Sequence, residues 1–184
     1  RGKPPNAIEG IATSRSRSDW IRGASIACIA GTLRPVRHTL RVTDVLEGAH
    51  IAGCRIDAVA GRGGMGIVYR ATQLSLGRPV ALKLIAPEHA ADGSFRERFQ
   101  RESRMAAAID HPNVIPVYEA GEEDGRLYLV MRWVAGTDLH KELRAHGRMD
   151  QERAARIVNQ VAGALDAAHA AGLVHRDVKP ANVL

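Results

Sequence analysis

The last ten residues of the chain, HRDVKPANVL (175–184), gather side chains that can exchange protons, balance negative charge and hold a metal ion. Asp177 can accept a proton from an attacking hydroxyl, and Lys179 can neutralise charge that builds up on a transferring phosphoryl group. Asn182 follows Asp177 by five residues and offers a hard oxygen ligand that suits Mg²⁺. Pro180 stiffens the loop between them. A polar turn would rarely contain all of these residue types in this order, so we predict a catalytic loop here.

A glycine-dense stretch with the spacing G-x-G-x-x-G lies nearer the N-terminus and suits the binding of phosphate groups. It consists of Gly61, Arg62, Gly63, Gly64, Met65 and Gly66. The pattern alone is weak, because a dinucleotide-binding fold, a phosphate-cradling loop and a flexible turn all use it. A dinucleotide fingerprint must open a helix, but the residues that follow here, IVYRA (67–71), alternate like a strand. The context therefore favours a strand–turn–strand loop whose backbone N–H groups cover a polyphosphate.

Lys83 lies in the apolar run VALK (80–83), in the middle of a predicted strand. An isolated buried charge is costly, so such a lysine either points to solvent or has a partner. Glu102, on the inward stripe of a predicted helix, can supply that partner, although a lone glutamate there would more often be a surface residue. We expect Lys83 to face phosphate oxygens and to be held by Glu102, with a solvent-facing lysine as the alternative.

The elements that must position these residues can be predicted from periodicity and turn residues. Residues 54–73 contain two β-like runs around the glycine turn, and residues 78–85 form another strand rich in branched apolar residues. A helix then begins near Ser94, which forms an S-x-x-E capping box with Glu97. The residues predicted to form the inward face of this helix recur every three or four positions. They are Phe95, Phe99, Glu102, Ala106 and Ile109.

The remainder of the chain changes from strands to helices. Residues 111–121 and 125–134 are predicted strands, and residues 137–147 are a predicted short helix. Residues 150–172 form a long helix, one face of which is lined by Ile157, Val161 and Leu165. A strand-rich half with one helix is thus followed by a helical half. This is an α+β arrangement with a seam near residues 132–138.

Composition and charge describe a soluble globular protein without a specific nucleic-acid partner. The 184 residues are 45% hydrophobic and 25% charged, with a net charge of +6. Residues 1–50 hold eight Lys or Arg and four Asp or Glu, whereas residues 51–184 hold eighteen and sixteen. The excess positive charge therefore lies in a stretch without sustained periodicity, which we interpret as a leader or disordered arm. A few marginal strands, or an arm that binds anionic surfaces, are the alternatives. Cys28 and Cys54 form no CxxC pair, so a zinc site or disulfide framework is not expected.

Together these pieces resemble the eukaryotic-type protein Ser/Thr kinase family, in its bacterial branch. The matching segments are GRGGMG, VALK, Glu102 within RESRMAAAIDHPNV, LVMRWVAG and HRDVKPAN, in that order and with family-like spacing. They span about residues 53–184, and nothing in residues 1–50 resembles the family. The resemblance implies a protein-kinase-like fold, with an antiparallel N-lobe sheet and one regulatory helix over about 51–134. The beginning of a mainly helical C-lobe would follow over 135–184.

The resemblance also implies roles for residues at matching positions. The ATP-binding set would cover the phosphates, enclose the adenine and contact the ribose: Gly61, Arg62, Gly63, Gly64, Met65, Gly66, Val68, Ala81, Lys83, Glu102, Met131, Trp133, Val134, Asp138 and Leu184. Lys83 would contact the α- and β-phosphates and pair with Glu102. Met131 would be the gatekeeper, next to a hinge that reads adenine through its backbone. Asp138 would contact the ribose.

For catalysis, the resemblance makes Asp177 the base, Lys179 a cation that stabilises the transition state and Asn182 a metal ligand. Arg176, before the base, suggests control by phosphorylation of an activation loop. ATP and Mg²⁺ are the implied cofactors, and proteins with Ser or Thr hydroxyls are the implied substrates. Self-association and autophosphorylation of a longer protein are compatible with the family.

Two departures from the family pattern bear on activity. Arg132 stands where the family often has Glu, but this matters little because the hinge reads adenine through its backbone. No D-F-G follows HRDVKPAN, so a second Mg²⁺-binding residue, the activation segment and the large C-lobe helices are not in this sequence. We therefore expect the truncated N-terminal part of a kinase domain, inactive alone, in which the helix over 150–172 leaves apolar surface exposed.

The resemblance leaves one alternative function, a non-catalytic pseudokinase that binds nucleotide or regulates another protein. A pseudokinase usually lacks one of the key residues, whereas Lys83, Glu102, Asp177 and Asn182 are all present here. This favours an enzyme. The resemblance implies a cytoplasmic kinase domain and allows membrane attachment through a later segment.

Overall fold

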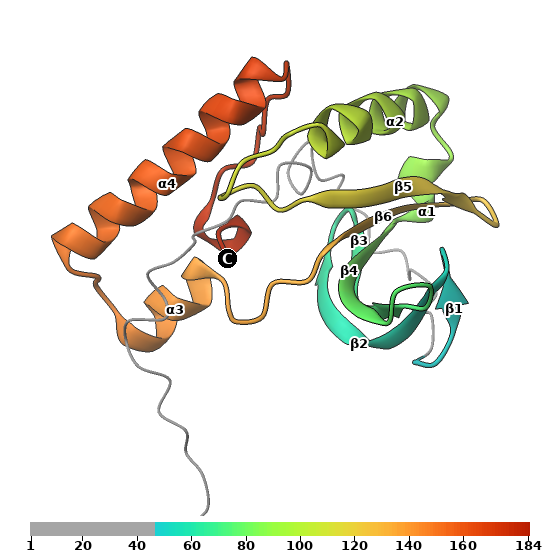
Figure 1. The fold of residues 1–184 in the computed structure, drawn as a ribbon, viewed down its shortest axis with the longest axis horizontal. Helices are drawn as coiled ribbons and strands as arrows, with labels where there is room; N and C mark the ends of the chain where they lie inside the picture. The colour runs from blue at the N-terminus through green and yellow to red at the C-terminus, as the bar shows by residue number, and fades with distance from the viewer. Residues whose placement is uncertain (1–46) are drawn as a thin grey trace, which may run out of the picture.

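The computed structural model describes residues 47–184. Within this part of the chain, six strands form one antiparallel sheet with the order β1-β2-β3-β4-β6-β5 (Figure 1). The strands are β1 His50–Ile51, β2 Cys54–Gly63, β3 Gly66–Gln73, β4 Arg78–Ile85, β5 Val117–Glu123 and β6 Arg126–Arg132. The strands predicted within 54–73 and over 78–85 and 125–134 are thereby confirmed, whereas the strand predicted over 111–121 begins only at Val117 and ends at Glu123. Most of the arm predicted over residues 1–50 lies outside the described residues.

The sheet curls strongly, so that its two edges approach each other. The backbone N–H of Ala52, between β1 and β2, donates to Oε2 of Glu123 on β5 at 2.7 Å. A buried core fills the inside of the curl, where alternate residues of β3 point inward together with residues of neighbouring strands. This core includes Cys54, Ile56, Ile67, Tyr69, Ala71, Leu82 and Val130. The curl gives β2, β3 and the turn between them a rigid base.

The helices lie against one side of the sheet and beyond its β5–β6 end (Figure 1). They are α1 Pro87–Ala90, α2 Gly93–Ala107, α3 Leu139–His146 and α4 Gln151–Ala170, with a short 3₁₀ turn η2 over Pro180–Asn182. A second core joins α2 and α4 to the sheet, and Phe95, Phe99, Leu129, Ala164 and Ala168 are buried in it. Burying one large apolar side chain contributes about 1.5–3 kcal/mol, so the two phenylalanines anchor α2 firmly.

The start of α2 differs from the prediction. The N-cap is Asp92, and its Oδ1 accepts hydrogen bonds from the backbone N–H of Ser94 at 2.9 Å and of Phe95 at 3.4 Å. The predicted capping box of Ser94 and Glu97 is therefore wrong, although the helix and its inward face are confirmed. The Asp92 carboxylate caps the helix in place of the Ser94 hydroxyl, because it accepts bonds from two free N–H groups. The Ser94 hydroxyl itself donates to this carboxylate at 2.8 Å.

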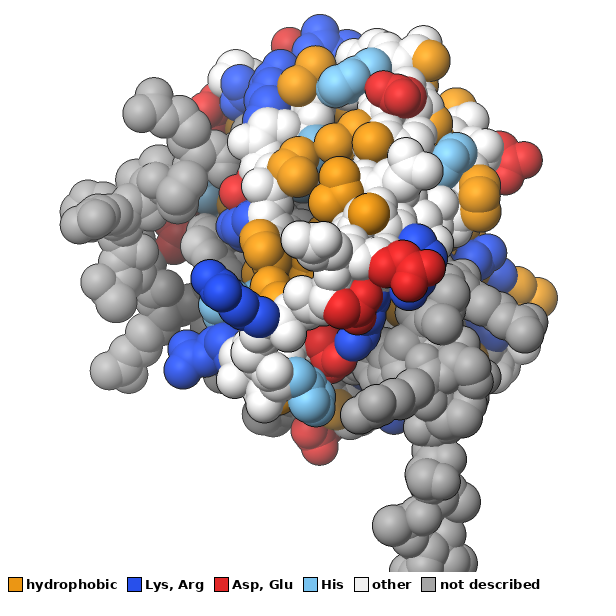
Figure 2. Space-filling model, turned by 90° about the vertical axis from the view of Figure 1, so that its left-hand side faces the viewer, with side chains coloured by type: hydrophobic (Ala, Val, Ile, Leu, Met, Phe, Trp, Pro, Cys, Tyr) orange, Lys and Arg blue, Asp and Glu red, His pale blue; other side chains and the backbone are white. Residues whose placement is uncertain are grey.

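The long helix α4 starts where the predicted range 150–172 begins: its N-cap is Asp150, whose Oδ1 accepts from the backbone N–H of Arg153 at 2.8 Å. The small residues Ala164 and Ala168 are its buried positions, while the predicted stripe of Ile157, Val161 and Leu165 is only half-buried. Val158 is 66% exposed. Figure 2 shows hydrophobic side chains gathered on the side of the molecule that carries α4, so the expected exposed apolar surface is present. In residues 47–184 no helix has the length and apolarity needed to cross a membrane.

The cap of α2 makes a testable prediction. Asp92→Ala should lower the free energy of unfolding, because two helical N–H groups lose their acceptor. Ser94→Ala keeps the capping carboxylate and should cost distinctly less. Urea denaturation followed by circular dichroism measures both. If Ser94→Ala lowers the free energy of unfolding more than Asp92→Ala does, the capping box expected from the sequence would be supported instead.

Candidate functional site

The glycine loop is a tight β-hairpin between β2 and β3, in which Gly63 pairs with Gly66. Gly66 has φ +141°, and a Cβ there would lie 1.9 Å from the carbonyl oxygen of Leu84. The N–H of Ala86 donates to the carbonyl of Met65 at 2.9 Å, which ties the tip of the hairpin to the end of β4. A strand follows the turn, as the sequence predicted, so the loop does not open a helix as a dinucleotide-binding loop would.

Lys83 lies in the middle of β4, between Val68 of β3 and Leu129 of β6. The residue is only 7% exposed, so the alternative of a solvent-facing lysine is wrong. Burial lowers the pKa of its ammonium group from 10.5 to about 8, and the negative charge of Asp177 offsets part of this effect. Among the described residues no carboxylate lies within 4.0 Å of its Nζ. A buried cation of this kind is stabilised when negatively charged oxygens come close.

Glu102 is buried in α2 with 5% exposure, but the structure pairs it differently from the expectation. Its Oε1 lies 4.0 Å from Nη1 of Arg176, and it makes no ion pair with Lys83. Burial raises the pKa of Glu102, while the charges of Arg176, Arg98 and Arg101 act in the opposite direction. The carboxylate thus has several guanidinium groups around it, and one of them belongs to the catalytic loop.

The catalytic loop holds Asp177 through a local network. Nζ of Lys179 lies 2.6 Å from its Oδ2, and the amide nitrogen of Asn182 donates to the same oxygen at 3.1 Å and to the Asp177 carbonyl at 2.8 Å. These hydrogen bonds, that from Lys179 first, hold the pKa of Asp177 below its usual value. Asp177 is therefore ionised at neutral pH and able to accept a proton. The structure brings the three predicted residues together.

His175 is a buried residue of the predicted catalytic loop to which the sequence assigned no role. Its Nδ1 accepts a hydrogen bond from the backbone N–H of Asp177 at 3.3 Å. This bond fixes the backbone that carries the catalytic carboxylate. The one sequence feature that could have indicated this role is the position of His175, two residues before Asp177 in an otherwise charged stretch.

The linker after β6 joins the sheet to the helical part and passes close to the chain end. Met131 pairs with Ala81 of β4, and the guanidinium of Arg70 lies 5.8 Å from the centre of the Trp133 ring. Farther along, the N–H of Leu139 donates to the carbonyl of Val183 at 2.8 Å. Sheet, linker and catalytic loop thus meet at one place. Val134 and Val68 are half-buried, whereas Leu184 is exposed.

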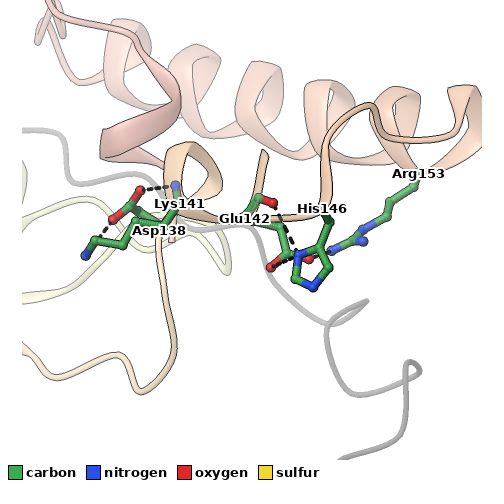
Figure 3. Close-up of polar contacts among 5 residues, drawn as sticks. All are labelled: Asp138, Lys141, Glu142, His146 and Arg153. Carbon is green, nitrogen blue, oxygen red and sulfur yellow. Dashed lines mark hydrogen bonds and ion pairs between the residues drawn. The ribbon is translucent and has the colours of Figure 1, made fainter. Parts of the chain in front are cut away.

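Asp138, the predicted ribose contact, is the N-cap of α3 (Figure 3). Its Oδ1 accepts from the backbone N–H of Lys141 at 2.9 Å, and its Oδ2 lies 3.0 Å from the Lys141 ammonium. One turn along, Glu142 accepts from Arg153 of α4 at 3.0 Å and lies 3.5 Å from Nδ1 of His146. This second group of charges joins α3 to α4.

Comparison with known proteins agrees with this geometry. The model of the protein kinase domain family matches residues 55–184. The chain belongs to the protein kinase family. Among curated relatives, the serine/threonine-protein kinase PknE of Mycobacterium tuberculosis is 48% identical over 138 residues, which cover 75% of this chain and 24% of that protein. PknH of the same species is 45% identical over 141 residues, 77% of this chain and 22% of PknH.

The fold is likewise that of a protein kinase. The crystal structure of the M. tuberculosis PknI kinase domain superposes with a TM-score of 0.71 at 40% identity, covering 77% of this chain and 57% of that one. The expected kinase-like α+β fold, with its curled antiparallel N-lobe sheet, is confirmed. The chain spans about a quarter of the length of the curated kinases it matches.

The site residues fit ATP and, in part, Mg²⁺. The buried ammonium of Lys83 suits phosphate oxygens, and the Gly66 backbone approaches β4 where no side chain would fit. Asn182 uses its amide nitrogen for the bonds to Asp177, which leaves its amide oxygen for a metal. Within residues 47–184 no group of three or more His, Cys, Asp or Glu could hold a metal ion. Mg²⁺ commonly needs only one or two protein ligands beside phosphates, so Asn182 remains suitable.

The burial of Lys83 predicts a pH-dependent stability cost. Lys83→Met should raise the free energy of unfolding at pH 7 by about 1–3 kcal/mol, because the folded protein no longer buries a charge. Between about pH 8 and pH 10.5 the folded wild type has lost this proton while its unfolded chain still binds it. Wild-type stability therefore rises through this window, and the advantage of the variant shrinks.

Urea denaturation at pH 7 and at pH 10 measures this difference. Lys141→Met, which removes an exposed ammonium, is the control and should change stability by less than about 1 kcal/mol at either pH. A Lys83→Met variant that is less stable than the wild type at pH 7 would contradict the argument.

Proposed function

We propose that this chain forms the nucleotide-binding and catalytic-loop part of an ATP- and Mg²⁺-dependent protein serine/threonine kinase. The observation that carries the proposal is the convergence of Lys83, Asp177, Lys179 and Asn182. Lys83 comes from the sheet and the other three from the catalytic loop, yet the charge of Asp177 reaches Lys83. A buried cation, an ionised carboxylate and a metal-binding oxygen at one place are the components of phosphoryl transfer.

In this proposal the nucleotide lies between the glycine loop and the catalytic loop. Gly61, Gly63 and Gly66 cover the phosphates, with Arg62, Gly64 and Met65 completing the loop. Lys83 binds the α- and β-phosphates. The adenine lies against Val68, Ala81 and Leu184, past the gatekeeper Met131 and the hinge backbone at Trp133 and Val134. The proximity of Val183 to Leu139 supports this arrangement, because it brings the floor and the ribose end of the site together.

In the proposed reaction, Asp177 orients a Ser or Thr hydroxyl and accepts its proton. The hydroxyl oxygen forms a bond to the γ-phosphorus as the bond between that phosphorus and the β,γ-bridging oxygen breaks, and ADP leaves with the electron pair. Lys179 lies beside Asp177 and stabilises the charge on the transferring group. Bound Mg²⁺ would neutralise phosphate charge, and Asn182 is the residue that would hold it.

Glu102 has a proposed role in the active state, as the partner of Lys83. In the structure the carboxylate of Glu102 lies near the guanidinium group of Arg176 instead. An exchange of Glu102 from Arg176 to Lys83 is the rearrangement that the proposal requires. Because the burial of Lys83 is costly without an anion, both Glu102 and the phosphates would stabilise its charge.

Serine and threonine are the proposed acceptors because Lys179 follows Asp177 by two residues, the arrangement that resembles Ser/Thr kinases. PknE and PknH carry the same designation in their names. For the longer protein we propose protein substrates, self-association with autophosphorylation, and a cytoplasmic kinase domain with membrane attachment by a later segment. A specific nucleic-acid partner is not proposed, because residues 51–184 have almost balanced charge.

A phosphotransfer assay tests the proposal on this chain and on a version extended through a complete kinase domain. In the extended version Asp177→Asn should lower kcat by about two orders of magnitude or more while ATP binding is retained. Asp166→Asn, on an exposed position of α4, is the matched control and should keep full activity.

Three outcomes separate the alternatives. Activity that survives Asp177→Asn would refute the assignment of the base. Nucleotide binding without any activity in the extended version would favour the pseudokinase. Activity in the 184-residue chain alone would contradict the expectation that it needs further C-lobe elements.

A further inference from the structure

One carboxylate of the proposed nucleotide site already has both of its oxygens engaged by a single residue. Oδ1 of Asp138 accepts from the backbone N–H of Lys141 at 2.9 Å, and Oδ2 lies 3.0 Å from the ammonium of the same lysine. Figure 3 shows the side chain of Lys141 folded back along the start of α3 onto Asp138. The two oxygens therefore contact different groups of Lys141: Oδ1 its backbone N–H and Oδ2 its ammonium.

The bond to Oδ1 is structural, because it satisfies an N–H group in the first turn of α3. The contact to Oδ2 is an ion pair with an exposed cation: the Lys141 side chain is 69% exposed, while that of Asp138 is only 12% exposed. Because the ammonium is open to solvent, such a pair contributes little to stability. Oδ2 is thus the oxygen that Asp138 can offer to another donor without loss of the helix cap.

The pair lies at the edge of the nucleotide site. The residue after Asp138, Leu139, donates its N–H to the carbonyl of Val183 at 2.8 Å, directly before the proposed adenine floor at Leu184. Asp138 also follows the linker from β6. A ribose that reaches this carboxylate would present hydroxyl groups, and these are hydrogen-bond donors like the Lys141 ammonium.

We propose that Lys141 is a positioning residue for ribose recognition, whose ammonium competes with the ribose hydroxyls for Oδ2 of Asp138. The inference rests on the proposed function, since it needs ATP at this site. Binding of ATP must displace or shift the ammonium. Lys141 therefore lowers the binding free energy that each hydroxyl contact contributes. As a result, it weakens the preference for a ribose over a sugar without hydroxyls.

The charges around the pair support this competition. The neighbouring Glu142 is engaged by Arg153 and His146 and does not hold the Lys141 ammonium, so Asp138 is the carboxylate that does. Burial raises the pKa of Asp138, but the hydrogen bonds and charge of Lys141 outweigh this effect and leave the pKa below its usual value. The carboxylate is ionised and attracts any donor that arrives.

The test compares ATP with 2′,3′-dideoxy-ATP, which lacks both hydroxyls, by direct binding titration to the full chain and its variants. Lys141→Met should strengthen ATP binding by about two- to fivefold, the size that an exposed ion pair of this kind contributes. Dideoxy-ATP binding should not change. Lys141→Arg keeps the ion pair and should restore the wild-type ratio of the two affinities. His140→Ala, next to Lys141 and exposed, is the matched control and should leave the ratio as in the wild type.

The variant Asp138→Asn separates failure of the inference from failure of the proposed site. Asparagine still caps a helix but carries no charge, so it should reduce the preference for ATP over dideoxy-ATP. If this preference persists in Asp138→Asn, Asp138 is not the ribose contact, and the assignment of the site falls. If Asp138→Asn reduces it but Lys141→Met shifts both nucleotides equally or neither, the role of Lys141 is refuted and the site stands. A wild-type chain that binds neither nucleotide refutes both.

Discussion

An ammonium group buried inside an apolar sheet is the constraint on which the rest of this site depends. Lys83 is enclosed by strands on both sides of β4, and a charge in such a place is unfavourable unless anions come close. The curl covers the face of β4 that carries Leu82, while Lys83 points to the opposite face, where the neighbouring Ile85 belongs to the core shared with α2 and α4. Negative charge near Lys83 therefore stabilises the folded protein. Asp177 of the catalytic loop supplies part of this charge.

The carboxylates around the site share one feature: each is engaged by a nearby cation of the chain. Glu102 lies near Arg176, Asp177 is paired with Lys179, and Asp138 is paired with Lys141. The contacts with Lys179 and Lys141 lower the pKa of Asp177 and of Asp138, whereas burial raises the pKa of Glu102. In the proposed function, binding of the nucleotide at this site is therefore an exchange of partners, in which phosphates, hydroxyls and a metal ion replace contacts that the protein makes to itself.

Much of the fold could be predicted because local pattern and tertiary packing agree. The strand over 78–85 and the helix over 150–172 have strong periodicity and clear terminal residues, and both form close to where they were expected. The start of α2 shows where this fails. Ser94 and Asp92 can both cap a helix, and the choice depends on which oxygen reaches the free N–H groups once the chain is folded. In α4 the tertiary packing decided burial: Ala164 and Ala168 lie in the core shared with α2, while the larger residues of the predicted stripe remain half-buried.

The sequence by itself determined the family to which this chain belongs. The order and spacing of the glycine loop, Lys83, Glu102 and the HRDVKPAN segment specify a kinase-like site, because residue types define which groups can bind phosphate, accept a proton or hold a metal. Only the tertiary structure decided which of these charges meet. The Lys83–Glu102 pair expected from the sequence is replaced by a contact between Glu102 and Arg176, and Asp138 is held by Lys141. Sequence spacing carries no information about distances between side chains on separate elements. Those distances follow from how the sheet curls and how the helices pack against it.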